Sequence, residues 1–287
     1  MRDFLRAILD AKREEIRTCR TRSAVIRARC AARTDFRDLK AALGGPDIAL
    51  IAEFKRRSPS RGILRDGADP VAQTRAYVRG GADAISVLTE RSFFAGSLDD
   101  LERIRSAVAV PVLRKDFILD PLQIEESVAF GADGVLLIAR ILRRAQLAEL
   151  IACARAYRMA ALVEVHDAAD LEKALAAGAD LIGVNSRDLV TFTVDPEVFV
   201  RLRPLIPTTC RTVAESGIHT ASDVARVRAL GYDAVLVGEA LMRDSDPAMK
   251  VRTLKSGNGG ISPQAVRRVS VDVEPLRGPQ SRVEESE

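Results

Sequence analysis

Charged side chains stand at the ends of short apolar runs in this sequence. The run at 48–54 contains Glu53 and is followed by Lys55, and the run at 160–166 ends with Glu164 and His166. Residues two positions apart on a strand point to the same face, so the members of each pair project together. A carboxylate beside an ammonium is suited to proton transfer and to holding an anionic group.

Four further runs end in polar residues. Polar residues that merely face solvent would not gather at the same end of six runs. An isolated pair most simply forms a salt bridge at the rim of a sheet, but two lysines and several glutamates converging favour a catalytic site. His166 and His219 have weaker cases: we interpret His166 as a loop histidine satisfied by the backbone, and His219 as part of a loop or of a helix start. The four further ends are Arg114, Lys115 and Asp116; Asn185, Ser186 and Arg187; Glu215, Ser216 and Gly217; and Gly238 with Glu239.

Eight such runs recur along the chain, and helical stretches separate them. They lie at 48–54, 84–89, 110–117, 134–139, 160–166, 181–185, 210–216 and 234–239. Several follow a Gly-x-Asp turn, in which glycine ends a helix and the turn leads into the next strand. Alternating strands and helices imply a parallel sheet, and eight units favour a closed (β/α)₈ TIM barrel over an open sheet. The GxGxxG fingerprint of an open dinucleotide-binding sheet is missing after the first run.

The chain divides into three parts by pattern. Residues 1–45 are predicted to form a helical extension over the barrel mouth, because Leu5, Ile8, Leu9, Lys12 and Ile16 follow helical spacing. Residues 46–249 are predicted to form the barrel. Residues 250–287 are rich in Gly, Pro, Ser and charge and are predicted to be a disordered tail.

Composition excludes several classes of function. No apolar run approaches the roughly 20 residues of a membrane span, and no secretory or transit segment is recognisable, so we expect a cytoplasmic protein without a membrane partner. Four scattered cysteines give neither a zinc pattern nor a disulfide framework, and no metal is expected. A net charge of +4 suits a small anionic substrate, but with 4% aromatic residues it does not indicate nucleic acid.

The last two strands carry a second signal, for phosphate. "ESGI" and "VGEALM" each place a glycine at a strand end, just before a helix. Exposed backbone N–H groups with a helix dipole behind them form an anion site, and the loops after strands seven and eight are the usual phosphate site of such barrels.

Seven sequence blocks resemble, in order, those of indole-3-glycerol-phosphate synthases. The blocks are "IAEFKRRSPSRG", "ISVLTERSFFAGSLDDL", "PVLRKDFILDPLQIEES", "ALVEVHDAADLEKAL", "IGVNSRDLVTF", "AESGI" and "VLVGEALM". The resemblance runs to about Asp246 and implies a TIM barrel of the tryptophan pathway. This family converts 1-(2-carboxyphenylamino)-1-deoxyribulose 5-phosphate to indole-3-glycerol phosphate, carbon dioxide and water, without metal or organic cofactor.

The resemblance also implies catalytic roles. Lys115 is expected to be the acid that protonates the ribulose carbonyl, with a pKa lowered by a second ammonium and apolar neighbours. Lys55 would pair with the anthranilate carboxylate and act in the loss of water. Glu164 would remove a proton during dehydration, Glu53 would position groups or assist, and Asn185 would hydrogen-bond the substrate.

The remaining candidate residues are expected to bind the substrate. Glu239 is a departure from the expected phosphate site, and its carboxylate is expected to turn away while its backbone N–H contributes. Two alternatives remain: a Schiff-base aldolase using Lys115, and a non-catalytic barrel of a binding or scaffolding protein. Oligomerisation beyond a monomer or a weak homo-oligomer is not expected. The candidates are Ser58, Pro59, Phe94, Leu113, Phe117, Leu136, Arg187 and Glu215 for the substrate body, and Ser216, Gly217, Gly238 and Glu239 for the phosphate.

Overall fold

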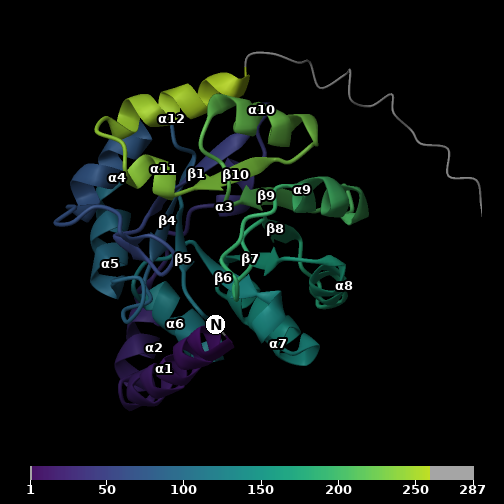
Figure 1. Cartoon of the computed structure of the whole chain (residues 1–287). Helices are drawn as coiled ribbons and strands as arrows, with labels where there is room; N and C mark the ends of the chain where they lie inside the picture. The colour runs from purple at the N-terminus through teal and green to yellow at the C-terminus, as the bar shows by residue number, and fades with distance from the viewer. Residues whose placement is uncertain (1, 259–287) are drawn as a thin grey trace, which may run out of the picture.

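The computed structural model describes residues 2–258 and shows a closed barrel of parallel strands (Figure 1). Around the barrel the order is β1-β10-β9-β8-β7-β6-β5-β4, and β1 pairs in parallel with both β10 and β4. The predicted eight-stranded TIM barrel is therefore confirmed. The barrel strands are β1 (Ala49–Phe54), β4 (Ala84–Leu88), β5 (Val112–Lys115), β6 (Gly134–Ile138), β7 (Ala160–Val165), β8 (Leu181–Asn185), β9 (Arg211–Glu215) and β10 (Ala234–Val237).

Two cores stabilise the barrel, because successive side chains of a strand point to opposite faces. Inward-facing residues such as Ile51, Leu113 and Leu162 fill the barrel interior. Their neighbours, such as Leu50 and Val163, pack beneath the surrounding helices. Burial on both faces explains why the strand sequences are almost continuously apolar.

The Gly-x-Asp turns have the predicted geometry and an additional role. Their glycines have positive φ, between 84° and 96°, which a residue with a Cβ rarely adopts. In three of the turns the aspartate carboxylate then accepts a hydrogen bond from the backbone N–H of the neighbouring strand, at 2.7–3.0 Å. Each turn thereby connects a helix end to the start of the adjacent strand. The glycines are Gly81, Gly131, Gly178 and Gly231; the accepting residues are Asp83, Asp133 and Asp233.

Several of the outer helices start at side-chain caps. Asp69, Asp120 and Thr220 accept from backbone N–H groups of the first turns of α4, α6 and α10. The ring consists of α4 (Pro70–Arg79), α5 (Leu98–Ala107), α6 (Pro121–Ala129), α7 (Arg144–Ala156), α8 (Ala168–Ala176), α9 (Glu197–Leu202), α10 (Ala221–Ala229), α11 (Glu239–Met242) and α12 (Pro247–Lys255), with 3₁₀ turns η1 (Ala139–Ile141), η2 (Arg203–Leu205) and η3 (Ser256–Asn258). A two-stranded ribbon, β2 (Arg57–Ser58) and β3 (Gly62–Ile63), lies in the loop after β1.

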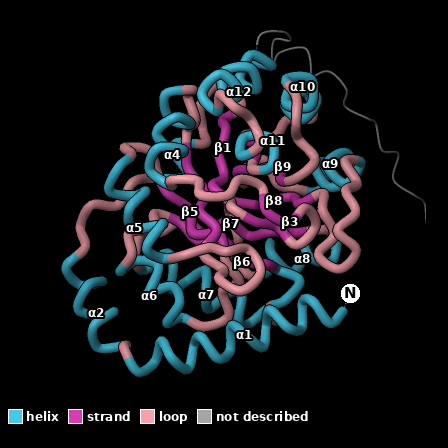
Figure 2. The backbone as a smooth tube through the Cα atoms, turned by 60° about the vertical axis from the view of Figure 1, so that its left-hand side comes forward, coloured by secondary structure: helices cyan, strands magenta, loops and turns pink. Residues whose placement is uncertain are grey.

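The amino-terminal segment reaches both ends of the barrel, whereas the sequence predicted a cover over the mouth alone. Helix α1 (Arg2–Thr21) runs along the lower edge of the molecule in Figure 2 and places Phe4 at the mouth; α2 (Ser23–Ala32) packs on α6. Helix α3 (Leu39–Ala42) lies at the opposite end, where Leu39 contacts Gly134 at the start of β6. The helical period of α1 places a charged residue, Lys12, among the apolar residues of its buried face. Lys12 is fully buried, and its Nζ lies 2.8 Å from Asp116 Oδ1.

The predicted start of the tail at residue 250 is wrong, because it falls inside α12. Val251 and Leu254 of this helix are fully buried, since helix α12 packs on α4. The remainder of the predicted tail, from residue 259 on, lies outside the described residues. Among residues 2–258 no helix is long and apolar enough to cross a membrane, and all four cysteines are free thiols.

Two truncations should separate α12 from the segment that follows it. Ending the chain after Asn258 is expected to leave the Tm and the turnover unchanged, because the removed residues are poor in apolar side chains. Ending it after Asp246 removes two buried aliphatic side chains, at a cost of roughly 3–6 kcal/mol in unfolding free energy. Thermal unfolding of both chains tests this. A large fall in Tm for the first truncation would show that the tail packs on the barrel.

Candidate active site

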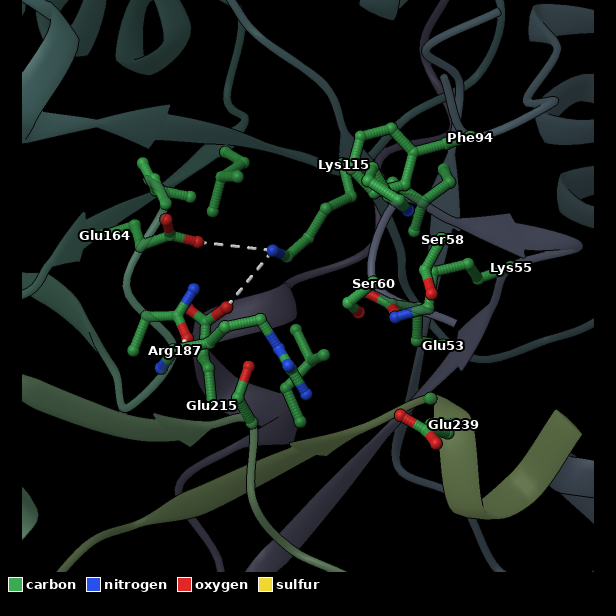
Figure 3. A pocket seen from close by; sticks show the side chains of 18 of the residues that line it. Glu53, Lys55, Ser58, Ser60, Phe94, Lys115, Glu164, Arg187, Glu215 and Glu239 are labelled. Carbon is green, nitrogen blue, oxygen red and sulfur yellow. Dashed lines mark hydrogen bonds and ion pairs between the residues drawn. The ribbon is translucent and has the colours of Figure 1, made fainter. Parts of the chain in front are cut away.

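One pocket lies where the carboxyl ends of the strands meet (Figure 3). Its charged residues continue the inward-facing rows of the barrel interior: Lys115 follows Leu113 on β5, and Glu164 follows Leu162 on β7. The backbone register also sets β8 beside β9, with Asn185 opposite Glu215. The pocket is thus the polar top layer of an otherwise apolar barrel.

All the candidates predicted from the sequence except Leu113 line this pocket. Leu113 is fully buried in the barrel interior, one layer below Lys115, so its prediction as a substrate-contacting wall is wrong. The residues brought together are Glu53, Lys55, Ser58, Pro59, Phe94, Lys115, Phe117, Leu136, Glu164, Asn185, Arg187, Glu215, Ser216, Gly217, Gly238 and Glu239.

Lys115 is the centre of the charged cluster. Its Nζ lies 3.2 Å from Glu164 Oε2 and 3.3 Å from Glu215 Oε2 (Figure 3). Both glutamates are 1% exposed as side chains and Lys115 is 14% exposed, so the lysine is the most accessible member of the cluster. One ammonium is therefore shared by two buried carboxylates.

The pKa of Lys115 is raised, contrary to the lowered value expected from the sequence. Burial alone would lower this pKa, but the carboxylates of Glu215, Glu164 and Glu53 outweigh the loss of solvation. The sequence could not show that three carboxylates surround the ammonium. Lys115 is thus protonated throughout the physiological pH range.

The two glutamates that share Lys115 differ in pKa. For Glu164, burial is outweighed by Lys115 and by His166, and its pKa is lowered. For Glu215, burial together with the charges of Glu164 and Glu53 outweighs Lys115 and raises the pKa to about 7. Carboxyl groups with divergent pKa values are suited to different proton-transfer roles. The sequence predicted Glu215 only as a substrate contact, and did not predict its titration near neutrality.

Glu215→Gln is expected to raise the Tm at pH 8 but not near pH 4.5. The folded-state pKa of Glu215 lies above its ordinary value of 4.5, so the stability from this group is present below about pH 4.5 and is lost as the pH rises through about 7. A permanently neutral amide avoids that loss, roughly 3 kcal/mol at pH 8. Thermal unfolding across this range is the measurement. Glu164→Gln is the control: the pKa of Glu164 is lowered, so its variant should gain no stability at pH 8.

A second ion pair stands across the pocket. Lys55 Nζ lies 2.5 Å from Glu53 Oε1, and Glu53 is 4% exposed as a side chain. A Cβ on Gly238 would lie 2.4 Å from the same glutamate oxygen, so any larger residue there would displace the Glu53 carboxylate. Ser58 Oγ, in the ribbon after β1, is buried without a hydrogen-bond partner and lines the pocket.

The apolar side of the pocket includes residues that the sequence analysis missed. Phe4 of α1 contacts Phe93 and Phe192 edge-on, at ring-centre distances of 4.9 and 5.2 Å. It reaches the pocket from a helix far away in the sequence, which local spacing does not reveal. The ring centres of Phe94 and Phe117 lie 6.3 Å apart, and both rings line the same pocket. The other missed apolar residues are Leu5, Leu88, Ile138, Leu189, Phe192, Ile218, Leu236 and Val237.

The turns after β9 and β10 form the other end of the pocket. Ser216 has a φ of 68°, which costs a non-glycine residue free energy and is typically retained at functional sites. The carboxylate of Glu239 lies 3.3 Å from Arg61 Nε and 3.6 Å from Arg243 Nε. Two arginines therefore neutralise the glutamate that the sequence analysis regarded as a departure. Arg187 also lines this end, with a pKa lowered chiefly by burial.

Within the described part of the chain, no group of three or more His, Cys, Asp or Glu residues is arranged to hold a metal ion. The fold and the pocket together define a barrel enzyme with acid–base groups on its inner strands. The chain belongs to the indole-3-glycerol phosphate synthase family, whose family model matches residues 5–254.

Curated relatives carry the same family name. The chain is 52% identical over 220 residues to the indole-3-glycerol phosphate synthase of Dehalococcoides mccartyi strain CBDB1, covering 76% of this chain and 85% of that protein. It is 48% identical over 269 residues to the synthase of Roseiflexus sp. strain RS-1, covering 90% and 100%.

Solved structures at low identity share the fold alone. The 3-hexulose-6-phosphate synthase of Salmonella typhimurium matches with a TM-score of 0.61 at 18% identity, covering 73% of this chain and 98% of that one. A thiamine phosphate pyrophosphorylase from Pyrococcus furiosus matches with a TM-score of 0.57 at 18% identity, covering 77% and 98%.

Proposed function

We propose that this pocket converts 1-(2-carboxyphenylamino)-1-deoxyribulose 5-phosphate to indole-3-glycerol phosphate, carbon dioxide and water. Family membership makes the chain a carboxy-lyase of tryptophan biosynthesis. The observation that carries the proposal is the buried Lys115 ammonium shared by Glu164 and Glu215, facing an apolar wall suited to an aromatic ring.

In ring closure, Lys115 donates a proton to the ribulose carbonyl oxygen as the aromatic carbon attacks. A raised pKa suits this role, because the ammonium is always charged and the alkoxide that develops is more basic than an amine. The same charge stabilises the developing oxyanion in a site with little water. Glu215, 3.3 Å away and with a pKa of about 7, is placed to return the proton to the amine.

The two later steps use the groups across the pocket. Lys55, oriented by Glu53, pairs with the carboxylate that leaves as carbon dioxide. The electron pair of the broken bond between this carboxylate and the ring carbon returns to the ring. Lys55 then protonates the departing hydroxyl. Glu164 takes the proton lost as the double bond forms, and Asn185 hydrogen-bonds the intermediate. The short pair of Lys55 with Glu53 supports this division of roles.

The phosphate is assigned to the turns after β9 and β10. Backbone N–H groups of Ser216, Gly217, Gly238 and Glu239 are the proposed donors. Arg61 and Arg243 offset the carboxylate of Glu239, so the phosphate meets no net repulsion there. Ser58 and Arg187 contact the substrate body, with Pro59, Phe94, Phe117 and Leu136 against the aromatic ring.

Incubating the purified chain with the synthetic substrate tests the proposal. We expect indole-3-glycerol phosphate and carbon dioxide in equal amounts, without added metal or organic cofactor. Absence of product would overturn the proposal, and borohydride trapping of an imine on Lys115 would indicate the aldolase alternative. A cytoplasmic location, supported by the free thiols, and a monomeric or weakly associating chain are further parts of the proposal.

A further inference from the structure

A buried imidazole stands behind Glu164, on the side away from Lys115. His166 Nε2 lies 3.4 Å from Glu164 Oε1, and His166 Nδ1 lies 3.6 Å from Asp170 Oδ2. The side chain is 4% exposed. Asp170, His166, Glu164 and Lys115 therefore form a row from the start of helix α8 to the centre of the pocket.

This histidine is not satisfied by the backbone, contrary to the sequence-based interpretation. Neither ring nitrogen has a hydrogen-bond partner, and the Glu164 oxygen that it faces has none either. Both nitrogens and that oxygen are shielded from solvent. Buried polar atoms are normally paired, so three unpaired atoms in one row require an explanation. Proton-transfer contacts are often long in an unliganded site and tighten during the reaction.

The far end of the row is held by cations. Asp170 Oδ2 lies 3.1 Å from Arg140 Nε, and Asp170 Oδ1 lies 3.7 Å from Lys173 Nζ. Burial opposes ionisation of Asp170, but its contacts with His166, Arg140 and Lys173 outweigh burial and lower the pKa. Arg140 also pairs with Asp167 and Asp188, which fixes its position. An anionic Asp170 favours a proton on the facing Nδ1, leaving Nε2 free to accept one.

We propose that His166 acts through Glu164, by taking the proton from this carboxyl group after each dehydration. This proposal rests on the proposed function, because Glu164 must first receive the proton from the intermediate. The proton moves from Glu164 Oε1 to His166 Nε2, restoring the carboxylate. The resulting imidazolium lies between the Glu164 and Asp170 carboxylates, and Asp170, 7% exposed as a side chain, is the route by which the proton later reaches solvent.

His166→Gln tests the proposal, because the amide can hydrogen-bond Glu164 but cannot accept its proton. Two rates are compared with the wild-type protein: the first turnover, measured with enzyme in excess of substrate, and the steady state. Glu164 begins the first turnover as a carboxylate, so that rate should stay within about threefold of wild type. The steady-state rate should fall about tenfold or more. Imidazole added at fixed pH and ionic strength should raise the steady-state rate of the variant, because a small base that enters the active-site pocket between turnovers can take the proton from Glu164.

Other outcomes overturn the proposal. Equal slowing of both rates without imidazole rescue would show that His166 only supports the position of Glu164. Wild-type values for both rates would show that it has no role. If the glutamine variant does not fold, His166→Asn replaces it. Failure of the proposed function itself would appear in the wild-type protein, which would then form no product.

Discussion

Lys115→Met is expected to lower kcat by roughly 10³ or more while the protein still binds phosphate-bearing product. Methionine matches the length of the lysine stem but cannot protonate the carbonyl oxygen or neutralise charge there. Loss of a general acid lowers the rate by a factor of about 10²–10⁴. Loss of electrostatic stabilisation lowers it by a further factor of about 10²–10³ if the two effects are independent. Steady-state kinetics and product-binding titration of the variant provide the measurement.

Lys55→Met is the matched control for Lys115→Met. It removes the other lysine of the pocket, which is proposed to pair with the ground-state carboxylate and later to protonate the departing hydroxyl, so KM should rise and kcat should fall, but by less than in Lys115→Met. The two roles are reversed if Lys55→Met abolishes turnover while Lys115→Met merely weakens binding.

The structure also predicts how Lys115→Met affects stability. Removing the ammonium leaves Glu164 and Glu215 buried without their shared cation, an arrangement that costs several kcal/mol at neutral pH. The loss should shrink as the pH falls and the carboxyls become neutral. The double variant Lys115→Met, Glu215→Gln removes one of the two charges and should recover part of the Tm at pH 8 but none of the turnover.

Glu164→Gln is expected to lower kcat by roughly 10²–10⁴ with KM nearly unchanged. Glutamine preserves the shape and the hydrogen bonding of the side chain but cannot accept the proton during dehydration. The first-turnover rate should fall as far as the steady-state rate, unlike in His166→Gln. Rapid-quench kinetics of both variants allow this comparison.

A Glu164→Gln protein with near-normal kcat would remove Glu164 from the proposed chemistry. The proton acceptor would then have to be sought at Glu53, or at Glu215 with its pKa of about 7. In that case the row through His166 would also have no function in turnover.

Sequence patterns alone predicted the barrel and the end of it that carries the chemistry. Period-two alternation fixes which residues of a strand face inward, so Glu53, Lys115 and Glu164 could be assigned to one face before any contact was known. The Gly-x-Asp turns marked the strand starts because a positive φ there requires glycine. Local spacing carries this information, and the order of strands in a parallel barrel follows from it.

The electrostatics and the limits of the site became clear only from the folded structure. The sign of the Lys115 pKa shift depends on three carboxylates from β1, β7 and β9, which are distant in sequence. A contact between distant segments also brought Phe4 to the pocket, packing in the barrel interior kept Leu113 beneath it, and the turn from β7 into α8 set His166 between two carboxylates. A pKa, and the division between pocket wall and core, depend on distances in three dimensions, and a linear pattern does not contain those distances.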